Sequence, residues 1–192
     1  MRKLLNKELG RKSIQQFRRS EKSPFVIVLD NIRSHYNVGS VFRTADAFLT
    51  DRIYLCGITA RPPHREIQKT ALGATESVEW VYYESTMDAI RYLKSEGYCI
   101  IGIEQTEGSF HLQDIPVKKG EKYALVFGHE VKGVDQQVID QCDMCVEIPQ
   151  FGTKHSFNIA VSAGIVLWEM SKNLTLNLPA GLEKHSRGRK RI

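Results

Sequence analysis

The apolar run FVIVLD, from Phe25 to Asp30, constrains the fold of this sequence most strongly. It has the length and the β-branched content of a strand, and no polar residue interrupts it before Asp30. Such a run is typical of a strand that is buried on both faces, as in a parallel sheet covered by helices. The next segment carries apolar residues three and four positions apart from Val38 to Leu49, which predicts a helix with one apolar stripe. Arg43 lies on the opposite face of that helix from Val41, so its side chain should point away from the core.

The same alternation of strand and helix continues along the chain. After a basic helix over residues 4–19, we expect strands near 52–56, 80–83, 98–103, 123–127 and 145–148, and helices over 85–96, 134–141 and from 157 onward. The 192 residues fit one domain. The predicted fold class is α/β, a mostly parallel sheet with helices on both faces. Ligands bind such sheets at the carboxyl ends of strands, so the loops after Leu29, Ile103, Phe127 and Ile148 are the candidate site.

Basic charge is concentrated at the two ends of the chain. Residues 1–22 hold eight Lys or Arg against two acidic residues, a net charge of +6, and residues 181–192 hold five against one, a net charge of +4. The remaining residues therefore carry a net charge of −5, since the whole chain carries +5. Basic terminal segments suit a polyanion such as RNA, because Lys and Arg contacts to phosphate release counterions. The alternative is that both ends are merely solvated.

Several common functions are disfavoured by missing motifs. No Gly-x-Gly-x-x-Gly follows a predicted strand, and Val134-Asp135 stands where a phosphate loop after Gly128 needs Lys-Ser/Thr. Cys142 and Cys145 have no second pair at zinc-finger spacing, so we interpret them as structural thiols and expect no metal. The first residues contain no apolar signal segment, and the apolar stretch over 157–170 is too short to span a bilayer. A cytoplasmic protein without a membrane partner is expected.

Three segments that follow predicted strands combine glycines with polar side chains. They are DNIRSHYNVGSVFRTA over residues 30–45, VFGHEVKGV over 126–134 and IPQFGTKHSFNIA over 148–160. In the third segment Asn158 opens a nearly all-apolar helix, on which Ser162 and Glu169 should complete one polar stripe.

Together the three segments resemble the three sequence motifs of the SpoU (TrmH-like) family of RNA ribose 2′-O-methyltransferases, part of the SPOUT superfamily. The resemblance covers residues 24–173 and includes KTALGA over 69–74. It implies a deep trefoil knot in the C-terminal half, which is an exception to the rule that chains avoid threading. It also implies S-adenosylmethionine as cofactor, tRNA or rRNA as partner, and a homodimer with the active site beside the interface.

The resemblance also implies roles for individual residues. Those matched to catalysis are Asn37, Arg43, Glu130, Ser156 and Asn158. Those matched to the cofactor are Glu104, Gln105, Thr106, Val126, Phe127, Gly128, Ile148 and Phe157. The chain departs from the family at Phe157, where leucine is usual, and at Ile159-Ala160, where Val-Ser is frequent. The expected domains are a basic helical extension over 1–22, a SPOUT methyltransferase domain over 23–175 and a basic flexible tail over 176–192.

Simpler roles remain open for most of these residues. Asn37 or Ser156 could cap the helix that follows it, Glu130 could be a solvated loop acid, and Asn158 could be a satisfied core amide. His35, His129 and His155 are interpreted as polar loop residues or RNA contacts. The predicted function is methylation of a ribose 2′-hydroxyl; the alternatives are a non-catalytic RNA-binding or ribosome-assembly module and a base methyltransferase.

Overall fold

The computed structural model describes residues 1–174; the predicted tail over 176–192 lies outside the described residues. Seven strands are present in this part of the chain: β1 (Phe25–Asp30), β2 (Arg52–Cys56), β3 (Glu79–Tyr83), β4 (Tyr98–Ile103), β5 (Phe110–His111), β6 (Lys122–Phe127) and β7 (Met144–Glu147). The helices are α1 (Ile14–Arg19), α2 (His35–Ala47), α3 (Arg65–Ala71), α4 (Ala74–Ser77), α5 (Thr86–Ser95), α6 (Gln136–Ile139) and α7 (Ile159–Leu174), with 3-10 turns η1 (Asn6–Glu8) and η2 (Leu112–Asp114).

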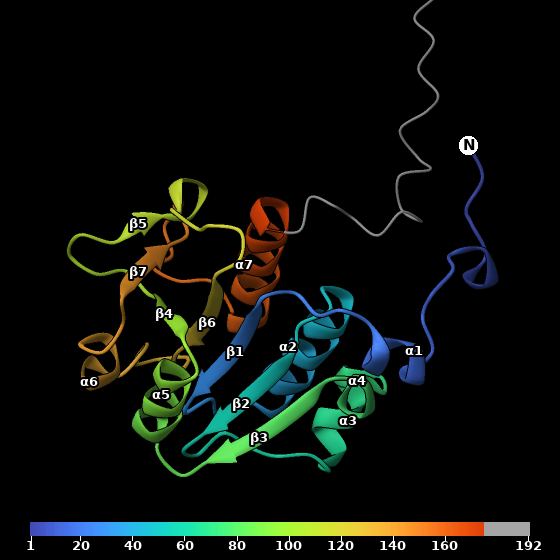
Figure 1. Ribbon diagram of the computed structural model, residues 1–192, viewed down its shortest axis with the longest axis horizontal. Coiled ribbons are helices and arrows are strands. Elements are labelled where there is room, and N and C mark those ends of the chain that lie inside the picture. Colours follow the sequence, from blue (N-terminus) through green and yellow to red (C-terminus); the bar gives the residue numbers. More distant parts are fainter. Residues whose placement is uncertain (175–192) are drawn as a thin grey trace, which may run out of the picture.

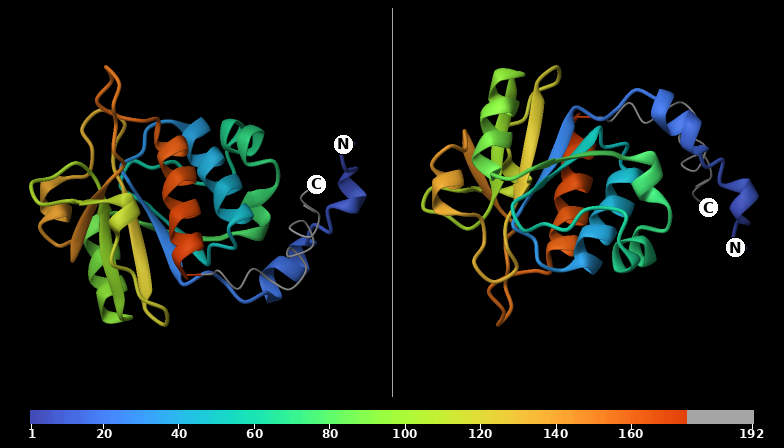
Figure 2. Two further views of the ribbon diagram at one scale, coloured as in Figure 1. Left: turned by 90° about the horizontal axis from the view of Figure 1, so that it is seen from above. Right: turned by 90° about the horizontal axis from the view of Figure 1, so that it is seen from below.

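The strands form one sheet in the order β3-β2-β1-β6-β4-β7-β5 (Figure 1). Every pairing between these strands is parallel. Helices lie on both sides of the sheet, with α2 and α7 on one side and α5 on the other (Figure 2). The α/β fold with a parallel sheet is therefore confirmed.

Strand β1 explains why its sequence is apolar without interruption. Phe25, Ile27 and Leu29 point into the core that the sheet forms with α2 and α7. Val26 and Val28 point into a second core with α5 and α6. All five side chains are at most 1% exposed. Because side chains alternate across a strand, only a strand covered on both faces buries every residue.

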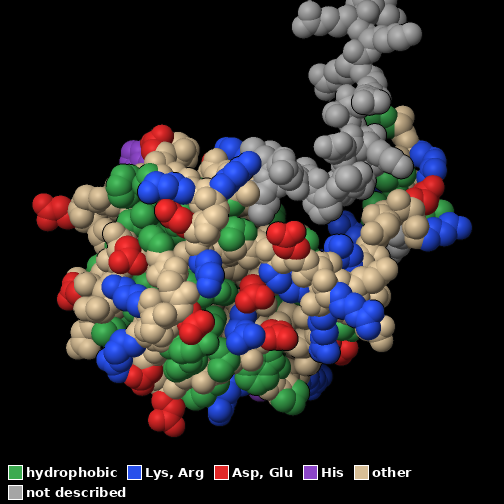
Figure 3. Space-filling view, in the orientation of Figure 1, with side chains coloured by type: hydrophobic (Ala, Val, Ile, Leu, Met, Phe, Trp, Pro, Cys, Tyr) green, Lys and Arg blue, Asp and Glu red, His purple; other side chains and the backbone are tan. Residues whose placement is uncertain are grey.

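The predicted basic helix over 4–19 is wrong in extent. The structure has only the turn η1 and the short helix α1, which begins at a capping box between Ser13 and Gln16. Gly10 lies between them with a φ of +59°, a left-handed conformation that ends any helix running through it. The described residues of this extension carry many of the Lys and Arg side chains seen at the right of Figure 3.

Other boundaries also differ from the prediction. The helix expected over 134–141 shrinks to α6, which begins after Asp135 because that side chain accepts the N–H of Gln137. Helix α7 begins at Ile159 instead of 157. Helices α3 and α4 and strand β5 were not predicted, because each is too short to show a period.

Helices α2 and α3 touch at Gly39, in the first of the three segments. A Cβ atom at this position would lie 2.1 Å from Thr70 Oγ1 and 2.3 Å from the carbonyl oxygen of Ile67. Only glycine allows this close approach. The start of α2, which carries Asn37, is thereby fixed against α3.

The C-terminal segment after β7 leaves the sheet and returns as α7 against α2 (Figure 1). The trefoil knot implied by the resemblance stays a prediction, because strand order by itself does not define threading. Among residues 1–174, no helix combines the length and the apolar character needed to cross a bilayer.

Candidate active site

Three residues, one from each of the three segments, meet beyond the carboxyl end of the sheet. The amide nitrogen of Asn37 donates to Glu130 Oε1 at 3.0 Å, and the amide nitrogen of Asn158 donates to Asn37 Oδ1 at 3.1 Å. These residues are separated by 93 and 121 positions in the sequence. Folding therefore brings together the three segments that the sequence singled out.

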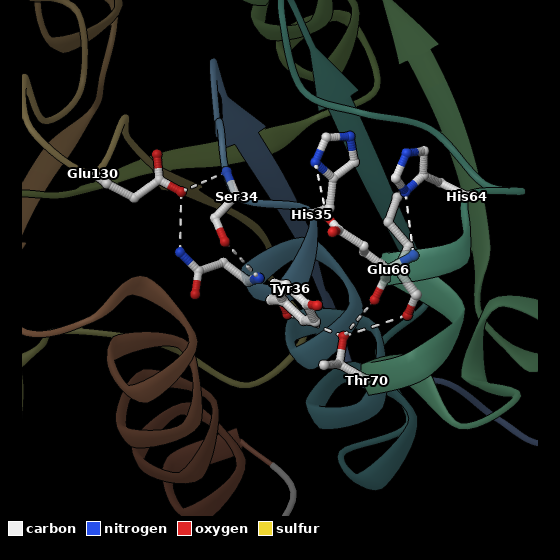
Figure 4. A network of polar contacts seen from close by, with 9 residues as sticks. Ser34, His35, Tyr36, His64, Glu66, Thr70 and Glu130 are labelled. Atoms are coloured by element: carbon white, nitrogen blue, oxygen red, sulfur yellow. Dashed lines mark hydrogen bonds and ion pairs between the residues drawn. The ribbon is translucent and has the colours of Figure 1, made fainter.

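The carboxylate of Glu130 sets the polarity of this network. It accepts the backbone N–H of Ser34 at 2.9 Å (Figure 4). It also accepts the backbone N–H of Arg33 at 3.0 Å and the side-chain amide of Asn37. A carboxylate only accepts, so Asn37 must present its NH₂ group to Glu130 and its oxygen to Asn158. Asn158 must then donate to Asn37, which leaves its own oxygen for the N–H of Ala160 at 2.9 Å. One negative charge thus orients both amides.

Two hydrogen bonds decide the capping alternatives. Ser34, not Asn37, caps α2, since its hydroxyl accepts the N–H of Asn37 at 3.3 Å. Asn158, not Ser156, caps α7 through the N–H of Ala160. Ser34 was not among the predicted residues, although Ser three positions before Asn37 is a recognisable N-cap signal.

The structure also gives partners to Glu169 and Glu130. Glu169, on the predicted polar stripe of α7, bonds to Lys172 and Asn173 on its own helix. Glu130 is no solvated loop acid, since its carboxylate accepts three hydrogen bonds from the start of α2 and the residues before it.

The environment lowers the pKa of Glu130 from its ordinary value. Partial burial acts to raise this pKa, but the hydrogen bonds from Arg33, Ser34, its own backbone N–H and Asn37 outweigh it. A carboxyl group whose pKa is lower in the folded state than in the unfolded state stabilises the fold at pH values above its unfolded-state pKa. This stabilisation is lost as the pH falls through the folded-state pKa.

We therefore expect Glu130→Gln to flatten the acid side of the stability profile. Melting temperatures measured from about pH 6 to about pH 3 should fall less in the variant than in the wild type, since Gln cannot titrate. Glu107→Gln, which changes an exposed acid with no hydrogen bond in the described chain, is the matched control and should leave the profile unchanged. Parallel profiles for wild type and Glu130→Gln would contradict the assigned role of this carboxylate.

Two of the residues matched to catalysis lie outside the network. Arg43, on α2, is exposed, as predicted, and forms no hydrogen bond or ion pair within residues 1–174. It lies six positions after Asn37, about 9 Å farther along the helix axis and about 120° around it. Ser156 is also exposed and unbonded in the described part of the chain. A single subunit therefore does not bring Arg43 to Glu130 and Asn158.

The loop after β4 holds the loop after β6. Glu104 accepts the N–H groups of Val134 at 3.0 Å and Gln105 at 2.9 Å. The glycines of the second segment serve this packing: a Cβ at Gly128 would lie 2.1 Å from the backbone of Gly133 and Val134. This close packing explains why residue 128 is a glycine. Val126 and Phe127 are buried, so their side chains belong to the two cores.

Asp30, which was not among the predicted site residues, ties the same loop to β1. Its buried carboxylate accepts the hydroxyl of Thr86 and the backbone N–H of Asp135 at 3.1 Å. A polar residue that ends an otherwise apolar strand was the available signal. The loop that carries Glu130 is therefore anchored from both β1 and β4.

A hollow of about 650 Å³ lies beside these loops. Gln105 and Ile148, two of the residues matched to the cofactor, line it, and Gln105 also donates to the carbonyl oxygen of His155 at 3.0 Å. Its remaining walls come from β5, η2, the end of β7 and the segment after it, with lining residues His111, Gln113, Glu147, Pro149, Gln150 and Phe151. Thr106 is half-buried and Phe157 is exposed, and neither lines the hollow.

Cys142 and Cys145 fill space against β4. The sulfur atoms of both lie 3.1 Å from the position that a Cβ at Gly102 would occupy. Burial, followed by the neighbouring Cys145 and Asp143, raises the pKa of Cys142 to about 12. A thiol that stays protonated is a poor nucleophile, which agrees with a structural role.

The all-parallel α/β sheet and the similarity to solved methyltransferase structures place the chain in the SPOUT methyltransferase class of folds. The model of the SpoU rRNA Methylase family matches residues 24–168, and the chain belongs to this family.

Two known methyltransferases are similar to this chain. The 23S rRNA (guanosine-2′-O-)-methyltransferase RlmB of Neisseria meningitidis is 32% identical over 154 residues, which cover 80% of this chain and 60% of the relative. The crystal structure of an AdoMet-bound rRNA methyltransferase from Sinorhizobium meliloti superposes with a TM-score of 0.75 at 27% identity, covering 80% of this chain and 58% of that one. The chain thus spans about three fifths of the length of both.

Proposed function

We propose that this protein methylates the ribose 2′-hydroxyl of an RNA, tRNA or rRNA, with S-adenosylmethionine as methyl donor. The observation that carries the proposal is the bonded series from Glu130 through Asn37 to Asn158, which joins the three segments at one end of the sheet. The names of the relatives, an rRNA 2′-O-methyltransferase and an AdoMet-bound rRNA methyltransferase, support it.

The hollow beside the loops fits the proposed donor. Its volume of about 650 Å³ lies within the usual range for cofactor sites. Ile148, Pro149 and Phe151 offer apolar surface for a purine ring, and Gln105 and Glu147 offer hydrogen-bonding and charged groups. When bound, S-adenosylmethionine supplies an electrophilic methyl group. We infer that Gln105 and Ile148 hold it, while Glu104 and Gly128 shape the adjoining loops.

The protein's own part in the reaction is alignment and charge stabilisation. A displacement at a methyl group needs the 2′-oxygen placed in line, more than it needs covalent help from the protein. We infer that the guanidinium of Arg43 binds the RNA phosphate and the 2′-hydroxyl and stabilises the developing negative charge. A guanidinium keeps its proton at neutral pH and is a very poor base, so positioning is the role assigned to Arg43.

Arg43 fits this role best if it serves the active site of a second subunit. Its side chain is exposed and unbonded in the described chain, and it points around α2 away from Asn37. Helix α7, which packs on α2, carries an exposed apolar stripe with Val161 49% and Trp168 63% exposed. A Cβ at Gly164, between them, would meet no atom within 4 Å. We infer that a second copy of the chain covers this stripe in a two-fold symmetric dimer.

Replacing Trp168 with glutamate should convert the dimer to a monomer. The charge would be buried without a partner in the apolar interface, which costs several kcal/mol. Sedimentation velocity at micromolar protein concentration measures the result. Ile58→Glu is the matched control, because Ile58 is also 63% exposed but lies outside α7, and it should stay dimeric. A dimeric Trp168→Glu variant would place the interface elsewhere.

We propose that the two basic ends of the chain, which flank the domain that starts at residue 23, bind the phosphate backbone of the RNA. Deleting residues 183–192 removes five Lys or Arg and should weaken RNA binding while leaving cofactor affinity unchanged. For every phosphate that the protein no longer neutralises, the slope of log K against log salt should become shallower by about 0.7 to 0.9. Fluorescence anisotropy over a salt series measures the slope. Replacing the five basic residues by Gln at full length separates charge from chain length, and an unchanged slope in either variant would contradict the proposal.

One assay tests the function as a whole. The full-length protein is incubated with tRNA or rRNA transcripts and methyl-labelled S-adenosylmethionine, and the RNA is then digested with a ribonuclease that needs a free 2′-hydroxyl. Ribose methylation predicts label in digestion-resistant dinucleotides. Label in mononucleotides would indicate a base methyltransferase. RNA binding without any donor binding by calorimetry would indicate a non-catalytic RNA-binding module.

A further inference from the structure

We propose that His35, His64 and Glu66 form a binding site for a divalent transition metal of the Zn²⁺ type. The three residues come from two separate parts of the chain, and their spacing matches no metal motif. Only folding groups them, because His35 is the first residue of α2 while His64 and Glu66 open α3. The close packing of α2 on α3 at Gly39 fixes the backbone beneath them.

The side chains already form a compact cluster. The two imidazole rings stack with centroids 3.9 Å apart and an angle of 23° between their planes. His35 Nδ1 lies 3.7 Å from a carboxylate oxygen of Glu66, and one donor atom from each of the three residues lies within 4.8 Å of the others. Figure 4 shows both rings on the same side of Glu66.

Imidazole nitrogen and carboxylate oxygen are ligands that zinc prefers. His64 Nδ1 accepts the N–H of Glu66 at 3.3 Å, a long and therefore weak hydrogen bond that a metal ion can replace. Ligand atoms bound tetrahedrally to one zinc ion lie about 3.3 Å apart. The three donor atoms, which lie within 4.8 Å of one another, must therefore approach each other by more than about 1 Å. They have room to rotate, since the side chains of His35 and Glu66 are 34% and 45% exposed.

The surroundings predict the character of the site. Three protein ligands at an exposed position leave the fourth place to water, as in open zinc sites. The amino ends of α2 and α3 carry partial positive charge, which opposes a cation and makes micromolar affinity more reasonable than nanomolar. The carboxylate of Glu66 offsets part of this charge.

Titration of the full-length, untagged protein with zinc chloride tests the proposal by calorimetry. One equivalent should bind, and His35→Ala, His64→Ala and Glu66→Gln should each weaken binding at least about tenfold, because even the outer partners of metal ligands contribute that much. His111→Ala is the matched control. Among the described residues His111 pairs with one acid, Glu147, at 3.2 Å, and its replacement should leave the zinc affinity unchanged.

Two further measurements make the test decisive. In Glu66→Gln the backbone N–H of residue 66 can still donate to His64, so the cap of α3 is kept. A loss of zinc binding by this variant is then not caused by unfolding, and a melting curve of the variant verifies that it is folded. Cobalt(II) in place of zinc should give visible ligand-field bands without a thiolate charge-transfer band. Equal affinity in wild type and all three variants, an equal loss in His111→Ala, or a thiolate band would overturn the proposal.

Discussion

Arg43→Lys is expected to lower the single-turnover rate of methyl transfer by about 10² to 10³-fold, the usual cost of losing a donor to the charge that develops in the transition state. Lysine keeps the positive charge but not the planar fork that can bind a phosphate and a hydroxyl together. Folding should be unaffected, because Arg43 is exposed and contacts no polar group in the described chain. Donor affinity should also be unchanged.

Rapid-quench assays with labelled donor and RNA measure this rate, with calorimetry for the donor and melting curves for the fold. Arg91→Lys is the matched control, because Arg91 is an exposed arginine on α5, across the sheet, whose one ion pair within residues 1–174 is with Asp88. It should keep the wild-type rate. Near-normal transfer by Arg43→Lys would exclude the positioning role of Arg43.

Mixed dimers decide which subunit Arg43 serves. Arg43→Ala and Asn37→Asp are each expected to be inactive alone. If Arg43 acts across the interface, one site in each mixed dimer is intact, and random pairing restores about a quarter of the wild-type activity. Co-expression of the two variants under separate tags provides the mixture. Activity no higher than in the single variants would contradict action across the interface.

The second large effect is expected from Asn37→Asp, which keeps the shape of the side chain but replaces its donor by a second carboxylate. Asn37 Nδ2 lies 3.0 Å from Glu130 Oε1, and two carboxyls at that distance do not both stay ionised. The network must then open or take up a proton. Since a misplacement of about 1 Å can cost about 10²-fold in rate, we expect a reduction of that order near neutral pH. Activity relative to the wild type should rise toward about pH 5, because a protonated Asp can donate again.

Reversing the pair provides the control. In Asn37→Asp/Glu130→Gln, the amide of residue 130 can donate to residue 37, and the amide of Asn158 can still donate there. The double variant should recover to within about tenfold of the wild-type rate, although one of the N–H groups of Arg33 and Ser34 no longer has an acceptor. Rates of the four proteins in a double-mutant cycle measure the coupling. A double variant no better than Asn37→Asp would show that the two residues do not act as a pair.

The sequence alone determined the sheet and the regions of the site. Uninterrupted apolar residues in β1 indicated burial on both faces, and the structure confirms it. The three glycine-containing segments after predicted strands were also correctly located, because parallel strands must present their carboxyl ends at one edge. Periodicity and strand polarity are local properties, so a sequence can show them.

Tertiary structure alone decided which atoms meet. Glu130 takes its donors from Arg33, Ser34 and Asn37, and Asn158 donates to Asn37. These bonds, and the stacking of His35 on His64, depend on contacts between distant segments. Short elements such as α3 escaped prediction because seven residues show too little periodicity. Side-chain partners depend on the path of the chain through space, and hydrophobic patterning specifies only which face of each element is buried.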